Sequence, residues 1–322
     1  MDIKKQQKNF AKHILYFVKN HKAFFPPDGK QKILIEKLRN EVMRSSIQKV
    51  YKEDEIKNEW QNFVDNLRYH ILNDDPRKFL QWKEISYTMV FGGSKYELFS
   101  LKNNWPYWRK IIKDSYFGMP PLSKYCWRSS GSYTHSAYHF QKLLTEFDIK
   151  LDKFKTIMEF GGGYGVMALL AYRQGFNGSY LIYDLPEFLA LQKYYLSSIN
   201  ETNFLLSDNI RNNVNTVSFF SKKEKLMDSL KRAQNIDLFI AMWSISESPL
   251  KLRENLFEKI FNTAKIKYVL IGFQKKFGDI DNCTYFKTFI NKYNNYSWKI
   301  EEISHLKDNY YLLGKNNKYD NH

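Results

Sequence analysis

Cysteine is scarce in this chain of 322 residues, which contains only Cys126 and Cys283. The two lie far apart and outside any C-x-x-C pattern, so they supply neither a disulfide framework nor a zinc site. The sequence also lacks an apolar run long enough to span a bilayer. Its basic N-terminus has only a short apolar stretch broken by charged residues, unlike a signal peptide. We therefore expect a cytoplasmic protein.

Acidic residues are also in short supply, with 34 Asp and Glu against 50 Lys and Arg and a net charge of +16. Such an excess favours anionic partners, namely nucleic acid, an anionic membrane surface or an acidic glycan. The lysines are scattered rather than gathered in one tract, however, and a lysine-rich proteome would produce the same balance. The hydrophobic fraction of 43% is enough for a normal core and argues against wholesale disorder.

The first 125 residues predict a mainly helical region. Residues 1–23 carry apolar side chains at helical spacing with lysines between them, and further helical patterns cover roughly 30–52, 54–73 and 76–90. An aromatic loop is expected at Trp105–Trp108. The basic first helix is suited to an anionic inner leaflet, although a packed helix explains the same pattern.

From about residue 154, short apolar runs alternate with helical patterns. This alternation predicts an α/β fold in which helices cover both faces of a mostly parallel sheet. The last two runs, W-K-I-E-E-I-S and Y-Y-L-L-G, are joined by a hairpin-like link at 307–309, so the sheet should include a C-terminal antiparallel strand. We expect a helical N-terminal region over 1–125, acting as a cap or acceptor-binding unit, and a catalytic domain over 126–322.

A nucleotide-binding motif follows the first strand of this domain. The strand ends at Glu159, a glycine-rich loop follows and a helix begins at once; the loop residues are Gly161, Gly162, Gly163, Tyr164 and Gly165. Glycines let the backbone approach a ligand and adopt positive φ. About twenty residues later the second strand ends at Asp184, whose carboxylate is placed to accept hydrogen bonds from both ribose hydroxyls of an adenosine, with Leu185 beside it.

Two cofactors compete for this motif. Gly163-x-Gly165-x-x-Ala168 also fits the fingerprint of a NAD-binding oxidoreductase. Glu159 argues for S-adenosylmethionine (SAM), because a carboxylate before the glycines can hold the amino or ribose end of that cofactor. In the register that starts at the strand end, moreover, the third small position of the fingerprint is Val166. The rest of the chain is used to complete one sheet, which leaves no substrate domain for a dehydrogenase.

The segments E-F-G-G-G-Y-G, Y-D-L-P-E-F-L and W-S-I-S-E-S resemble those of a bacterial sugar O-methyltransferase family found among surface-polysaccharide genes. The resemblance covers roughly 118–275 and is strongest at 157–197. It implies a Rossmann-like class I methyltransferase fold, SAM as cofactor with S-adenosylhomocysteine (SAH) as product, and a sugar hydroxyl as acceptor, on an acidic or lipid-linked glycan among others. A peripheral contact with the membrane or with glycosyltransferases is compatible with this function. The D-L-P triplet is shared with plant-type small-molecule O-methyltransferases.

A methyltransferase of this kind needs a general base, because a hydroxyl is a poor nucleophile until it loses its proton. The strand 237–243 leads to Glu247 at the edge where ligands bind, and Glu247 is the first candidate base or acceptor anchor. It would equally cap a helix starting near Pro249. In the plant-type enzymes a histidine acts from this region, whereas this chain has Ser246 and Glu247.

A second candidate cluster precedes the first strand. His135 and His139 are four residues apart, so they would share one helix face, and either suits a base because the histidine pKa lies near neutral pH. We expect no metal, since no H-E-x-x-H pattern or nearby carboxylate accompanies them. Arg128 would hold the methionyl carboxylate or an acidic substrate. Tyr164 and Trp243 would lie near the sulfonium, where aromatic faces stabilise a cation. Packing is the alternative explanation for all five residues.

Two other functions compete with sugar methylation. Nucleic acid is disfavoured as an acceptor because base-amine methylation usually goes with an N/D-P-P-Y/F segment after the fourth strand, where this chain has W-S-I-S-E, and because neither cysteine follows a proline. Ribose methylation of RNA stays open, as does methylation of another small molecule. A non-catalytic scaffold is disfavoured by the intact Glu159 and Asp184.

Overall fold

A computed structural model describes residues 22–47, 58–91, 93–121, 123, 125–126, 128–199, 204–207 and 215–319, together with 11, 14, 15 and 18. The helix predicted over 1–23, and with it the membrane contact, lies for the most part outside these residues. None of the helices in the described part of the chain combines the length and apolarity needed to cross a membrane.

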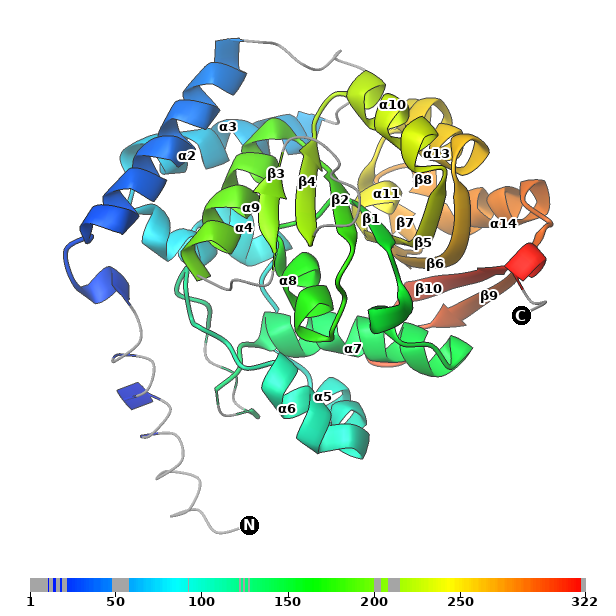
Figure 1. Ribbon diagram of the computed structural model, residues 1–322, viewed down its shortest axis with the longest axis horizontal. Helices are drawn as coiled ribbons and strands as arrows, with labels where there is room; N and C mark the ends of the chain where they lie inside the picture. The colour runs from blue at the N-terminus through cyan, green and yellow to red at the C-terminus, as the bar shows by residue number, and fades with distance from the viewer. Residues whose placement is uncertain are drawn as a thin grey trace.

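Eight strands of the described chain form one sheet in the order β3-β4-β2-β1-β5-β6-β10-β9 (Figure 1). All neighbouring pairs are parallel except β6–β10 and β10–β9. This order, with the last strand inserted antiparallel between β6 and β9, is that of the Rossmann-like class I methyltransferase sheet, so the predicted fold is confirmed. The strands are β1 Thr156–Phe160, β2 Ser179–Tyr183, β3 Leu205–Ser207, β4 Thr216–Phe220, β5 Asn235–Met242, β6 Lys265–Gln274, β9 Tyr296–Glu302 and β10 Asn309–Asn316.

Helices cover both faces of the sheet (Figure 1). One face is covered by α7 Gly131–Phe147, α8 Val166–Arg173 and α9 Pro186–Ile199, and the other by α10 Lys223–Ala233, α13 Glu258–Thr263 and α14 Asn282–Lys292. The helices α2 Gly29–Ile47 and α3 Asn58–Asn73 pack against α9. Successive strand residues point to opposite faces. Leu238 accordingly belongs to the first core and Phe239 to the second, and Leu313 and Leu312 divide in the same way.

The N-terminal region is helical, as predicted, but two details differ. Pro76–Gln81 forms a 3-10 helix, η3, and the α-helix α4 Lys83–Thr88 follows only after Trp82, whose extended backbone separates the two. The loop expected at Trp105–Trp108 is wrong, because Trp105–Ile111 forms helix α6. Pro106 lies in its first turn, where a backbone N–H needs no partner within the helix. The helices α5 Lys95–Leu101, α11 Ser244–Glu247 and α12 Leu250–Leu252 complete the set used below.

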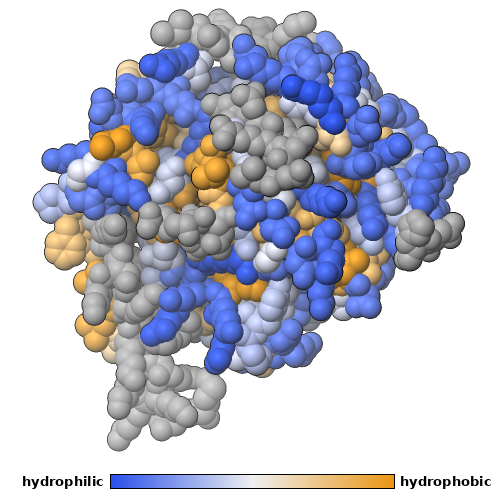
Figure 2. Space-filling model, in the orientation of Figure 1, coloured by the Kyte–Doolittle hydropathy of each residue, from blue (hydrophilic) through white to orange (hydrophobic). Residues whose placement is uncertain are grey.

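On the face shown in Figure 2, hydrophilic residues are spread over most elements, with apolar patches between them. The first of the two hydrophobic cores contains buried side chains from α2, α3 and the sheet, among them Val42, Leu67 and Ile182. The N-terminal helices therefore pack directly on the α/β unit, and the boundary between 125 and 126 stays a prediction.

Candidate active site

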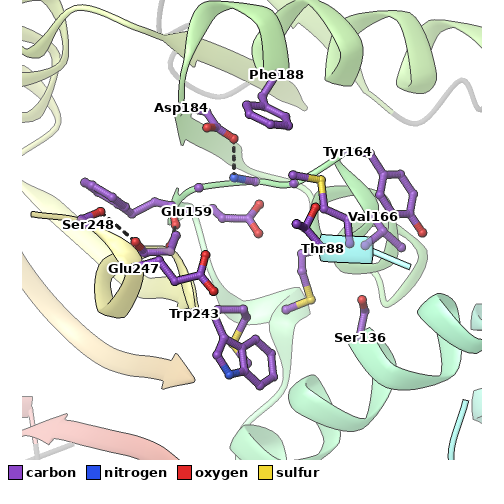
Figure 3. A pocket seen from close by; sticks show the side chains of 18 of the residues that line it. Thr88, Ser136, Glu159, Tyr164, Val166, Asp184, Phe188, Trp243, Glu247 and Ser248 are labelled. Atoms are coloured by element: carbon purple, nitrogen blue, oxygen red, sulfur yellow. Dashed lines mark hydrogen bonds between the residues drawn. The ribbon is translucent and has the colours of Figure 1, made fainter. Parts of the chain in front are cut away.

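A cavity of about 490 Å³ opens at the carboxyl ends of β1, β2 and β5 (Figure 3). Its volume lies within the range of small-molecule sites, and its position is where open α/β sheets bind ligands. The sheet supplies one side of the lining through the β1–α8 loop and the residues after β2 and β5. The other side is supplied by α3 and α4 of the N-terminal region and by α7.

The glycine-rich loop connects β1 to α8 and borders the cavity through Gly161, Gly162 and Gly163. Gly161 has φ of 76°, and a Cβ added there would collide with the Cβ of Ser244; a Cβ on Gly162 would lie 2.8 Å from Cγ2 of Ile182. Both positions therefore require glycine, as the motif predicts. Gly165 does not line the cavity, because it occupies the N-cap of α8 and packs against Leu196.

Glu159 is 2% exposed and points its carboxylate into the cavity (Figure 3). The hydroxyl of Tyr180 donates to its Oε2 at 2.9 Å. Burial raises the pKa of Glu159 to about 8, against the smaller effect of that hydrogen bond. Burial destabilises the ionised form of this carboxyl group. A cationic ligand beside it would stabilise that form, because a nearby positive charge favours ionisation. The site therefore fits the ammonium group of a bound amino acid.

Asp184 follows β2 and is fixed by three donors. The backbone N–H of Gly162 donates to Oδ2 at 2.9 Å, Nε2 of Gln192 to Oδ2 at 2.7 Å, and the backbone N–H of Leu185 to Oδ1 at 2.7 Å. Burial raises the pKa of Asp184 to about 7 although these hydrogen bonds oppose it. Asp184 and Leu185 both line the cavity, so the glycine loop and the second strand meet there as the motif predicts (Figure 3).

His135 and His139 both line the cavity from α7, as their spacing predicts. Nδ1 of His135 lies 2.5 Å from Oε1 of Glu97 on α5, and Nε2 of His305 lies 2.8 Å from the same oxygen. Burial alone would raise the pKa of Glu97, but the hydrogen bonds and charges of the two histidines lower it overall. An ionised carboxylate only accepts, so Nδ1 of His135 is a donor. Its buried Nε2 has no hydrogen-bond partner among the described residues.

The surroundings of these histidines are aromatic. The His135 ring stacks on Phe91 with centroids 3.9 Å apart and on Trp243 with centroids 5.6 Å apart. His139 is buried, and its Nδ1 lies 2.6 Å from the hydroxyl of Tyr311. Burial lowers the pKa of His139 well below its usual value, and the neighbouring histidines lower it further. His139 is therefore held neutral, and the partner of its Nδ1 is a hydroxyl, whereas His135 has a carboxylate on Nδ1.

Trp243 and Glu247 reach the cavity from the end of β5. Trp243 has φ of 62°, an uncommon conformation for a bulky residue that is found at functional sites, and its Nε1 donates to Oδ1 of Asn309 at 2.7 Å. Glu247 points into the cavity, where Nε2 of Gln274 donates to its Oε1 at 3.4 Å (Figure 3). Helix α12 has Pro249 at its N-cap and no side-chain cap, so Glu247 does not cap it.

The segment that carries Glu247 is held by a buried arginine. Arg253 donates to the backbone carbonyls of Ser246 at 2.6 Å and Ser248 at 3.0 Å, and to Oδ1 of Asn282 at 2.8 Å. It is 1% exposed, and burial lowers its pKa to about 10. Arg253 thereby fixes the turn after β5.

The positions of two predicted residues do not support their expected roles. Arg128 is exposed, has a backbone φ of 66° just before α7, and is absent from the cavity lining. Its position lends no support to contact with the cofactor carboxylate, which stays a prediction. Tyr164 lines the cavity, but its ring packs mainly against Phe79 and Tyr195, with centroids 5.9 and 4.9 Å away. Packing therefore accounts for Tyr164.

Other lining or supporting residues escaped the sequence analysis. They are Trp60, Glu97, Gln192, His305 and Asn309. None belongs to a recognisable motif. Only Glu97 carried a usable signal, as an acidic residue within an apolar helical segment, which is found buried only when it has a partner.

The sequence matches no protein-family model and no curated protein. Solved structures with a similar fold include the methyltransferase domain of bacterial CtHen1, at 14% identity over 56% of this chain and 97% of that chain, with a TM-score of 0.41. Magnesium protoporphyrin IX methyltransferase of Synechocystis PCC 6803 with bound SAH matches at 11% identity over 69% and 97%, with a TM-score of 0.39. Precorrin-6y C5,15-methyltransferase of Geobacter metallireducens GS-15 matches at 13% over 58% and 88%, with a TM-score of 0.38. Likenesses of this degree say nothing about the substrate of this chain.

Proposed function

We propose that this protein is a SAM-dependent O-methyltransferase that methylates a sugar hydroxyl. The observation that carries the proposal is the convergence of two sets of groups in one cavity. Glu159, the glycine loop and Asp184 form one side, and the carboxylate-bound histidine His135 forms the other. The first set suits an adenosine-bearing amino acid, and the second suits removal of a proton.

On the cofactor side, Glu159 would hold the ammonium group and Asp184 the ribose hydroxyls. SAM, when bound, supplies a methyl group on a positively charged sulfur, and its transfer leaves a neutral thioether. Gly161, Gly162 and Gly163 line the cavity and carry no side chains, so the loop meets the cavity through its backbone. A loop of this kind at a helix N-terminus also favours the negative carboxylate of the ligand.

On the acceptor side, Nε2 of His135 accepts the proton of the attacking hydroxyl as its oxygen bonds to the methyl carbon. Glu97 keeps the other ring nitrogen protonated and stabilises the imidazolium that forms, as the carboxylate of a catalytic triad does. Such general-base assistance contributes roughly 10²- to 10⁴-fold to a rate. The cavity must also hold the hydroxyl in line with the methyl–sulfur bond.

The charge of the cavity supports a neutral hydroxyl acceptor. Among the described residues that line it there is neither lysine nor arginine, whereas Glu159, Asp184 and Glu247 are present. Burying a phosphate or a carboxylate beside these groups without a cationic partner is costly. The alternative acceptor is a ribose hydroxyl of RNA, and the phosphates next to that ribose would have to stay outside the cavity. Phe91 and Trp243 offer the aromatic surface on which the C–H face of a sugar packs.

The first experiment is calorimetric titration of the full chain with SAM and SAH, beside Asp184→Ala and the surface control Asp228→Ala. Micromolar binding that is lost only in Asp184→Ala supports the cofactor site. Release of SAH in the presence of neutral glycosides, compared with uronic acids, nucleotide sugars and RNA, then tests the acceptor. Binding of a nicotinamide dinucleotide in place of SAM would overturn the proposal.

A further inference from the structure

We infer that Trp60 on the N-terminal helix α3 forms part of the subsite for the adenine base of the cofactor. This inference rests on the proposed function. It assigns a cofactor contact to a helix outside the α/β unit, to which the sequence assigned only a cap or acceptor role.

Trp60 borders the cavity at the end that contains Asp184. It lines the cavity together with Leu185 and Phe188, and its ring meets that of Phe188 edge-on with centroids 6.0 Å apart. Figure 3 shows the Phe188 ring beside the Asp184 carboxylate. If Asp184 holds the ribose, the base attached to that ribose must lie within a few ångströms of it. The aromatic and apolar surface at this end is supplied by Trp60, Leu185 and Phe188.

The strands and the loops that follow them offer few other contacts for an adenine ring at this end of the cavity. Within the described chain, neither β4 nor the residues 221–222 that connect it to α10 contribute to the cavity lining. An adenine ring is flat and apolar on both faces, and it gains most by contact with an aromatic side chain. Helix α3 provides one such side chain, Trp60, beside Phe188 of α9.

Helix α3 is attached to α9 through Glu187, the residue that precedes Phe188. Nη1 of Arg68 on α3 lies 3.0 Å from Oε1 of Glu187, whose side chain is only 3% exposed. On α2, Nζ of Lys193 from α9 meets Oε1 of Glu41 at 2.6 Å. Nε of Arg39 donates to the carbonyl of Ile71 at 3.1 Å and thus joins α2 to α3. The two helices are therefore attached to the first turns of α9, and α3 brings Trp60 to the edge of the cavity.

The test compares Trp60→Leu, which keeps apolar bulk without an aromatic face, with Trp60→Phe, which keeps the face. Phe63→Leu is the matched control, because Phe63 contacts Trp60 on the same helix without lining the cavity. Calorimetry with the full chain measures the Kd of SAH and of 5′-methylthioadenosine, which has the adenine and ribose but lacks the amino-acid part. Thermal unfolding without ligand checks that each variant is folded.

We expect Trp60→Leu to weaken both ligands by about 10-fold or more, Trp60→Phe by less than about 3-fold, and Phe63→Leu not at all. Unchanged SAH binding in Trp60→Leu would overturn the inference, as would a loss that spares 5′-methylthioadenosine. If Trp60→Leu does not fold, equal weakening by Trp60→Phe and Phe63→Leu would overturn it as well. Absence of SAH binding by the unmodified protein would refute the proposed function instead.

Discussion

His135 and Glu97 form a buried histidine–carboxylate pair, with Nδ1 and Oε1 2.5 Å apart across 38 positions of the chain. The pair joins α7 to α5 and fixes which ring nitrogen carries the proton. Because Glu97 also accepts from His305, its carboxylate has two donors that favour the ionised form. This geometry leads to the first prediction.

Glu97→Gln should lower kcat by about 100-fold or more while leaving the Kd of SAH within about 2-fold, since the amide cannot stabilise the imidazolium that forms on His135. SAH release in the presence of an acceptor measures kcat, and calorimetry measures Kd. Glu301→Gln is the control, because its carboxylate pairs with Lys142 away from the cavity. A normal kcat in Glu97→Gln would exclude His135 as the base.

Gly161→Ala should abolish SAH binding and lower the free energy of unfolding by about 2 kcal/mol. The added methyl group would meet the Cβ of Ser244, and alanine is strained at φ of 76°. Gly29→Ala at the start of α2 is the control, because no atom lies within 4 Å of the position that its added methyl group would take. Equal effects of the two substitutions on urea unfolding and on calorimetric titration would contradict the packing argument.

Glu159→Gln should make the free energy of unfolding of the unliganded protein less sensitive to a rise in pH. The pKa of Glu159 is raised by burial to about 8, above that of an unfolded glutamate. Between these two values the unfolded state binds fewer protons, so stability falls as pH rises. The free energy of unfolding of the unmodified protein should therefore drop more between pH 5 and pH 8 than that of Glu159→Gln, by a few kcal/mol. Parallel profiles from urea titrations would contradict this prediction.

Arg253→Leu should lower the free energy of unfolding by about 3 kcal/mol, because it leaves the carbonyls of Ser246 and Ser248 without their buried donor. It should also weaken acceptor binding, since the turn that carries Glu247 loses its support. Arg232→Leu on α10, where the arginine is exposed, should change neither quantity. Chemical denaturation measures the free energy of unfolding, and steady-state kinetics measure the acceptor KM. Unaltered values in Arg253→Leu would show that the turn after β5 does not depend on Arg253.

The cofactor half of the site was predictable because it is local. Glu159, the glycines and Asp184 lie within one strand–loop–helix–strand unit, whose geometry follows from residue type and period. Helical spacing likewise placed His135 and His139 on one face. The acceptor half was predictable only in part, because Glu97 and His305 meet across 208 positions and no short-range pattern records that contact.

The positions of Arg128 and of the Trp105–Trp108 segment differ from what the sequence led us to expect, and both differences have local causes. Arg128 was assigned to the cofactor from its charge, but a left-handed turn directs it to solvent, and side-chain chemistry does not reveal that turn. The aromatic run at Trp105–Trp108 was interpreted as a loop because of Pro106, although proline is well tolerated in a first helical turn.

The insertion of β10 between β6 and β9 affects the order in which the protein becomes active during its synthesis. Tyr311, the partner of His139, and Asn309, the partner of Trp243, both lie on this strand. A ribosome translates them after every other element of the sheet. In a nascent chain the strands around the glycine loop can therefore pair before β10 is synthesised. The contacts that β10 makes with His139 and Trp243 form only after β10 has paired with β6 and β9. If the proposed function holds, activity would therefore begin only after β10 has joined the sheet.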